Sequence, residues 1–147
     1  MWEEQTMAEA AKTFRLDILS AEHDIYRGRA VELIFPAMDG GQVGILPGHA
    51  AFIGVLSPGE LAYKTPDGGW HRYAVSTGSI SMANNRCIIL PQAAETPGEI
   101  DEVRAKEARD RALEALRQKQ SIMEYKRTQA SLARALTRLK IKGGHYI

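Results

Sequence analysis

The chain has 147 residues, a hydrophobic content of 44% and a formal net charge of +1, which suits a folded protein of one domain or two small ones. Its longest apolar runs, such as residues 87–90, are far shorter than the roughly 18 residues that a membrane-spanning helix needs. The acidic first dozen residues lack the basic start and hydrophobic middle of a secretory signal. We therefore expect a cytoplasmic protein that does not itself cross a membrane.

The charge is distributed unevenly along the chain. Residues 1–100 carry 7 basic and 12 acidic side chains, a net charge of −5. Residues 101–147 carry 12 basic and 6 acidic side chains, a net charge of +6. This change of sign predicts two regions with different partners.

Residues 13–97 show the pattern of an antiparallel β-sandwich or flattened barrel, preceded by a polar extension over residues 1–12. Apolar and polar residues alternate in short segments, most clearly over residues 14–18, 31–35, 61–63, 73–75 and 80–82. Turn residues separate these segments at residues 39–41, 57–59, 66–69 and 84–85, and Asp67-Gly68 is a strong hairpin signal. Cys87 is the only cysteine, and its apolar strand predicts a core position.

Residues 98–147 have the composition of helices. After Pro97-Gly98, residues 99–142 contain neither glycine nor proline and are rich in Ala, Leu, Arg, Lys, Glu and Gln. Asp101 and Glu102 suit the start of a first helix, and Lys140 and Lys142 suit the end of a second. We expect a break near residues 118–121 and hence a helical hairpin, with one long helix as the alternative. The fold class is therefore α+β.

The expected second helix carries an arginine stripe. At 100° per residue, Arg127, Arg134 and Arg138 lie on one side. The opposite side is an apolar seam of Tyr125, Leu132, Leu136 and Leu139. The stripe fits either the solvated face of an amphipathic helix or an anion site, because guanidinium groups suit phosphate oxygens. The sequence leaves both interpretations open.

Two motifs give the chain a family resemblance. The first is Gly44-Ile45-Leu46-Pro47-Gly48-His49-Ala50, followed by Leu56-Ser57-Pro58-Gly59, and the second is Ile100-Asp101-Glu102-Val103-Arg104-Ala105. With these motifs, the chain resembles the ε subunit of bacterial F-type ATP synthases, and the resemblance extends from about residue 13 to residue 141.

The resemblance implies that the sandwich binds the rotor, meaning the γ subunit and the ring of c subunits. Taken without the family, His49 is expected to be a structural turn or core histidine. The implied interface residues lie in and before the Pro47-Gly48 turn: Gln42, Gly44, Leu46, Pro47, Gly48 and His49. Gln42 stands where many family members carry an acidic residue, so a contact there is expected to be neutral.

The second motif matches the I-D-x-x-R-A pattern associated with ATP binding by bacterial ε subunits. The resemblance implies that ATP is a regulatory ligand held by Glu95, Ile100, Asp101, Arg104, Ala105, Arg127, Arg134 and Arg138. Without the family, Asp101 and Arg104 would be expected to form a local ion pair.

No catalytic constellation is visible. The sequence has no phosphate-binding Gly-x-x-x-x-Gly-Lys-Ser/Thr loop, and its four histidines lack metal-ligand spacing, so we expect neither an enzyme nor a metal site.

The resemblance implies a coupling subunit of a proton- or sodium-driven rotary ATP synthase, peripheral on the cytoplasmic face of the bacterial membrane. Its helices would restrain ATP hydrolysis at the α and β subunits. The alternative is a nucleic-acid-binding module that uses the basic hairpin. The acidic sandwich and the scarcity of aromatic residues among the helical basic residues argue against that alternative.

Overall fold

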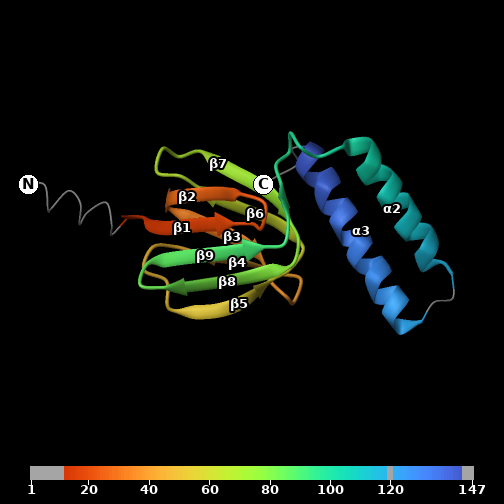
Figure 1. Ribbon diagram of the computed structural model, residues 1–147, viewed down its shortest axis with the longest axis horizontal. Coiled ribbons are helices and arrows are strands. Elements are labelled where there is room, and N and C mark those ends of the chain that lie inside the picture. The colour runs from red at the N-terminus through yellow and green to blue at the C-terminus, as the bar shows by residue number, and fades with distance from the viewer. Residues whose placement is uncertain (1–11, 119–120, 144–147) are drawn as a thin grey trace, which may run out of the picture.

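The computed structural model describes residues 12–118 and 121–143, which form a β-sandwich followed by a helical hairpin (Figure 1). The expected polar extension lies, except for its last residue, outside the described part of the chain. The strands are β1 Phe14–Leu19, β2 Asp24–Ala30, β3 Glu32–Pro36, β4 Gln42–Ile45, β5 Phe52–Leu56, β6 Gly59–Lys64, β7 Trp70–Val75, β8 Gly78–Ala83, β9 Arg86–Pro91 and β10 Ala94–Glu95. The helices are α2 Glu102–Leu116 and α3 Ile122–Gly143.

The strands form two five-stranded sheets. The first sheet has the order β2-β1-β9-β8-β5 and the second has the order β10-β7-β6-β3-β4. Inward side chains from both sheets make one core, including Leu16 and Ile89 from the first sheet and Leu33 and Leu61 from the second. The expected sandwich is confirmed, because alternate residues of each strand point into the space between the sheets.

One pairing differs from the expected antiparallel arrangement. β1 and β9 are adjacent and parallel, with Leu16 opposite Cys87 and Ile18 opposite Ile89. The chain leaves the first sheet after β2 and returns in β5, and this path brings β9 beside β1 in the same direction. The other paired strands are antiparallel. Cys87 is fully buried in this ladder, and burial raises the pKa of its thiol to about 12.

The hairpin and its break are also confirmed. Asp101 is the N-cap of α2, and its side chain accepts a hydrogen bond of 3.1 Å from the backbone N–H of Arg104. The contact seen between these residues is thus a helix cap rather than the expected ion pair. At the start of α3, Ser121 and Glu124 form reciprocal side-chain to backbone hydrogen bonds, the capping box of a helix start.

The orientation of α3 differs from that expected for an amphipathic helix, because the arginine stripe and the apolar seam are each partly covered. α3 lies between α2 and the sandwich, where it contacts β6 and β7 (Figure 1). Leu136 and Tyr125 of the apolar seam are 49% and 45% exposed, whereas its other two residues, Leu132 and Leu139, are half-buried. Arg134 and Arg138 are half-buried as well. A solvated face therefore does not describe the stripe at these two arginines. It describes only Arg127, which is exposed.

Small side chains line the contact between the two helices. Ala105 and Ala112 of α2 are buried, as is Ala135 of α3. Within residues 12–118 and 121–143, no helix is long and apolar enough to cross a membrane.

Candidate functional site: two hollows at the helical hairpin

The first hollow, called the linker hollow below, lies where the strand region passes into α2. Its volume is about 550 Å³. It is lined by Glu95, Glu99, Asp101, Arg104, Ala105, Glu107, Ala108, Arg111 and Arg138. The capping of α2 by Asp101 fixes the first helical turn, so Arg104 and Ala105 are presented at its wall.

The second hollow, called the helix hollow below, lies between α2 and α3. Its volume is about 360 Å³. It is lined by Ala108, Arg111, Ala112, Ala115, Arg127, Thr128, Ser131, Arg134 and Arg138. The small side chains of the helix contact leave this space, and the arginines project into it from both helices.

The structure brings most of the expected nucleotide residues to these two hollows. Five of them line the linker hollow: Glu95, Asp101, Arg104, Ala105 and Arg138. The helix hollow contains the remaining arginines of the stripe, and Arg138 lines both hollows. Ile100 is buried at 4% exposure and does not line either of them.

Sequence reasoning missed Arg111, which also lines both hollows. A signal for it was present in the spacing. Arg111 follows Arg104 by seven residues, so both side chains project from one face of α2. The hollows therefore receive cationic groups from both helices.

Arg138 is held by Glu95. The Nη2 of Arg138 donates to Oε1 of Glu95 at 2.5 Å, and its Nε donates to Oε2 at 3.1 Å. The two side chains are 36% and 31% exposed, and they join α3 to β10 across 43 positions of sequence. This two-bonded contact keeps one guanidinium at the junction of the hollows.

The two hollows differ in charge. Four carboxylates line the linker hollow, namely those of Glu95, Glu99, Asp101 and Glu107. The helix hollow is lined by four arginines and by no carboxylate among the described residues. An anion is therefore favoured in the helix hollow, whereas the linker hollow offers acceptors to hydroxyl and amino groups.

The expected partner residues lie along β4 and the turn that follows it. In this turn His49 N–H donates to the carbonyl of Leu46 at 3.1 Å, and Gly48 has a φ of +80°. Glycine suits such a position because it carries no Cβ. The His49 ring is half-buried and contacts the Phe52 ring edge to face, with centroids 5.3 Å apart.

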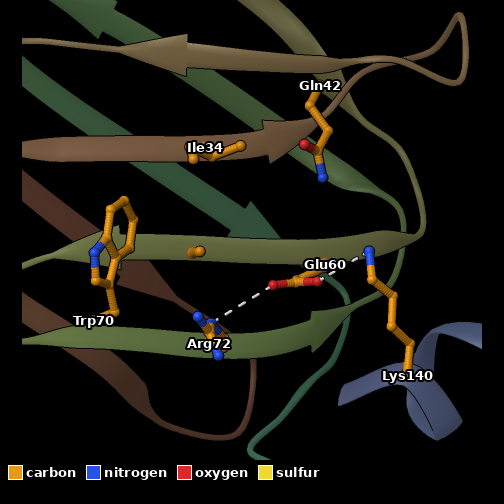
Figure 2. Close-up of a pocket in the computed structure, with 7 residues that line it drawn as sticks. Ile34, Gln42, Glu60, Trp70, Arg72 and Lys140 are labelled. Atoms are coloured by element: carbon orange, nitrogen blue, oxygen red, sulfur yellow. Dashed lines mark ion pairs between the residues drawn. The ribbon is translucent and has the colours of Figure 1, made fainter. Parts of the chain in front are cut away.

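The structure separates Gln42 from the rest of this set. The turn is tied to the β8–β9 turn, because Gly48 N–H donates to the Asn85 side chain at 2.9 Å, at the end of the sandwich away from the hairpin (Figure 1). Gln42, at the start of β4, lines a hollow of about 200 Å³ that also involves Lys140 of α3 (Figure 2). The expected partner residues thus lie at two separate places, the turn after β4 and the hollow beside Lys140.

An apolar surface accompanies the turn. Ile53 and Val55 on the outer side of β5 are 88% and 47% exposed, and Leu46 in the turn is 59% exposed. On β9, Leu90 is 47% exposed. Ile53 and Val55 lie opposite Ser81 and Ser79, and Leu90 lies opposite Ser79, so the three apolar residues share the outer face of the first sheet. Among the described residues there is no cluster of three or more His, Cys, Asp or Glu side chains that could hold a metal ion.

Comparison with known proteins gives matches over nearly the whole chain. The family model described as "ATP synthase, Delta/Epsilon chain, beta-sandwich domain" matches residues 13–97. The family model described as "ATP synthase, Delta/Epsilon chain, long alpha-helix domain" matches residues 99–143. The ATP synthase epsilon chain of Thioalkalivibrio sulfidiphilus is 40% identical over 132 residues, which are 89% of this chain and 93% of that protein. That of Nitrosococcus oceani is 37% identical over 130 residues, covering 88% and 92%.

Two solved structures share the fold. A chain of the Euglena gracilis mitochondrial ATP synthase, in a structure of its OSCP/F1/c-ring, has a TM-score of 0.74 at 19% identity, with 83% of this chain and 76% of that chain covered. A chain of the Tetrahymena thermophila central stalk and c-ring has a TM-score of 0.66 at 11% identity, with 87% and 95% covered.

Proposed function

We propose that this chain, which belongs to the ATP synthase delta/epsilon family, couples the rotor to the catalytic head and restrains ATP hydrolysis. The proposal is supported by its match to epsilon chains of the family over most of its length. The sandwich binds the γ subunit and the ring of c subunits. The hairpin acts on the α and β subunits, and ATP is a regulatory ligand of the hairpin. The chain is then a non-catalytic, peripheral component of a membrane-bound rotary complex driven by protons or sodium ions.

The observation that carries the regulatory part is the convergence of the expected nucleotide residues. Glu95, Asp101, Arg104 and Arg138 are separated by up to 43 positions of sequence and line one hollow. Arg127 and Arg134 line the adjoining hollow. Hydrogen-bonding and charged groups that converge on one hollow between structural elements are typical of a ligand site.

The charge difference between the hollows suits the two halves of ATP. Arg127, Arg134 and Arg138 would hold the phosphate groups, and Arg111 adds a further cation. The carboxylates of the linker hollow would accept hydrogen bonds from ribose hydroxyl or adenine amino groups. The phosphates would compete with Glu95 for Arg138, so the ion pair lowers the affinity that the arginines alone would give.

The orientation of α3 supports a hairpin with a second position. In the docked position the helix turns Arg134 and Arg138 inward and leaves Leu136, Tyr125 and Ile122 exposed, the last at 77%. An apolar helix face gains free energy when a partner covers it. The undocked hairpin would place this face against the catalytic head or γ, and ATP would favour the docked position through its greater affinity for it.

The rotor attachment rests on the surface beside the Pro47-Gly48 turn. Leu46, Ile53 and Val55 offer exposed apolar area, and His49 offers a polar group at its border. A core of apolar residues with a polar rim is the usual composition of a protein interface.

Removal of the hairpin tests the division of labour. A chain truncated after residue 96 should still bind γ and support ATP synthesis in a reconstituted complex, because its partner surface is intact. It should lose the restraint on ATP hydrolysis. A truncated chain that fails to assemble, although circular dichroism shows it folded, would contradict the assignment of coupling to the sandwich.

A further inference from the structure

A second ion pair joins α3 to the sandwich, two residues beyond Arg138. The Nζ of Lys140 lies 3.6 Å from Oε2 of Glu60 on β6. On the other side of the same carboxylate, the Nε of Arg72 on β7 lies 3.9 Å from Oε1. Figure 2 shows Glu60 between these two cations, one from the sandwich and one from the hairpin.

Glu60 depends on these cations because it is largely removed from water. Its side chain is only 10% exposed. Burial raises the pKa of this carboxyl, whereas the positive charges of Lys140 and Arg72 act to lower it. A buried carboxylate that loses a partner is unfavourable, so the docked helix supplies part of what keeps Glu60 ionised.

The Glu60–Lys140 pair lies outside the proposed nucleotide site. Neither residue lines the linker hollow or the helix hollow. Both line the separate hollow of about 200 Å³ on the outer face of the second sheet, with Trp70 and Gln42. ATP in the nucleotide site would therefore compete with Glu95 for Arg138 and leave Lys140 on Glu60.

Few apolar side chains of α3 are fully buried. Among the described residues of α3, the buried ones are Ala135 and Ile141, and Leu132 and Leu139 are half-buried. Lys142 adds a hydrogen bond of 3.4 Å to the carbonyl of Pro97. Polar contacts near the end of α3 thus add to its attachment to the sandwich.

We infer that Glu60 and Lys140 form a nucleotide-independent anchor that keeps the hairpin docked on the sandwich when ATP is absent. The anchor is a property of the isolated chain. One consequence rests on the proposed function: the anchor would raise the free energy needed to undock the hairpin, and the undocked hairpin is the form that restrains ATP hydrolysis. Two sandwich carboxylates thus act on one helix, and only Glu95 is subject to competition by ATP.

The test measures docking directly in the full-length chain without ATP or partner subunits. Spin labels on Lys126→Cys in α3 and Thr77→Cys in the sandwich report the distance between the two parts. Cys87 is fully buried with a raised thiol pKa, so it should remain unlabelled. With Glu60 and Lys140 unaltered, the distances between the two labels should form one distribution, centred at the short distance of the docked hairpin.

Charge reversal should release the hairpin. In Lys140→Glu the ratio of docked to undocked chains should fall about tenfold or more, because two carboxylates then face each other. Lys140→Met, which leaves every sandwich residue intact, should shift the ratio in the same direction. Lys140→Arg, which keeps the positive charge opposite Glu60, should keep the hairpin docked. Lys106→Met is the matched control, because it removes an ion pair with Glu102 that lies within α2.

The inference is overturned if Lys140→Glu and Lys140→Met both keep the short distance, or if Lys106→Met releases the hairpin equally. It is also overturned if Lys140→Arg releases the hairpin while circular dichroism shows a folded sandwich. Because neither ATP nor γ is present, none of these outcomes depends on whether the proposed function is correct.

Discussion

Arg138 of α3 and Glu95 of β10 form a two-bonded ion pair at the junction of the linker and helix hollows, with contacts of 2.5 and 3.1 Å. The pair makes one guanidinium serve two purposes. The Arg138 guanidinium fastens the hairpin to the sandwich, and it would also bind a phosphate group in the helix hollow. Docking of the hairpin and binding of a nucleotide are therefore linked through a single side chain.

Neutralising Glu95 should loosen the ATP-free hairpin. Glu95→Gln removes the charge but keeps the shape, and about 1 kcal/mol is expected for a partly exposed pair, or about a fivefold lower ratio of docked to undocked chains. Saturating ATP should restore docking, because a nucleotide that contacts residue 95 of the sandwich in the linker hollow and the arginines of the hairpin binds the docked position more tightly. The spin-label distances measure both. An ATP-free distribution identical to that of the unaltered chain would show that the pair does not fasten the hairpin.

Stability at acidic pH should depend on Asp17. Its side chain is 3% exposed and pairs with Arg15 and Arg86 at 3.1 and 2.9 Å. Burial alone would raise its pKa, but the hydrogen bonds and charges of Arg86 and Arg15 outweigh burial, so the pKa lies below its ordinary value of 3.8. The stabilisation is therefore present above the ordinary pKa and is lost as the pH falls through the lower pKa of the folded chain.

Asp17→Asn should reduce the free energy of unfolding at neutral pH by about 1–3 kcal/mol, and the variant should lose less stability than the unaltered chain on acidification. Urea unfolding at several pH values measures this. Asp24→Asn is the control, since Asp24 pairs with Arg27 at the surface with side chains more than half exposed, and it should change little. Equal effects of the two substitutions would refute the special role of Asp17.

Rotor binding should be sensitive to Ile53. The side chain is 88% exposed, so Ile53→Asp should leave the sandwich folded while weakening γ binding by about tenfold or more, as expected for a residue near the centre of an interface. Leu113→Asp on α2, where the residue is 42% exposed, is the control and should bind γ normally. Surface plasmon resonance with γ compares them. Unchanged binding by Ile53→Asp would place the interface elsewhere.

The strands that the sequence predicts are those whose inward positions carry large apolar side chains. β1 and β3 present residues such as Leu16 and Leu33 to the core. β2 gives a weak signal because Tyr26, Gly28 and Ala30 occupy its inward positions, with the Tyr26 ring lying over Gly28. The parallel pairing of β1 with β9 follows from the path of the chain between sheets, which no local pattern encodes.

The site was predictable where residues belong to a local motif. Asp101, Arg104 and Ala105 share one helical turn, and their common location follows from that spacing. The inward orientation of Arg138 was not predictable from periodicity, because periodicity assigns the apolar side of a helix to the core. Here the carboxylates Glu95 and Glu60 lie on the sandwich surface that receives α3, and they attract its cationic side.

Calorimetric titration of the isolated chain with ATP tests the central claim most directly. The unaltered chain should bind ATP at submillimolar concentration, and Arg134→Ala should bind about tenfold to a hundredfold more weakly, because a charge-assisted hydrogen bond contributes about 1.5–3 kcal/mol. Arg117→Ala is the control, since Arg117 pairs with Glu114 at the exposed end of α2 and lines neither hollow, and it should bind normally. Absence of binding at millimolar ATP, or equal affinity of all three chains, would contradict the proposed nucleotide site.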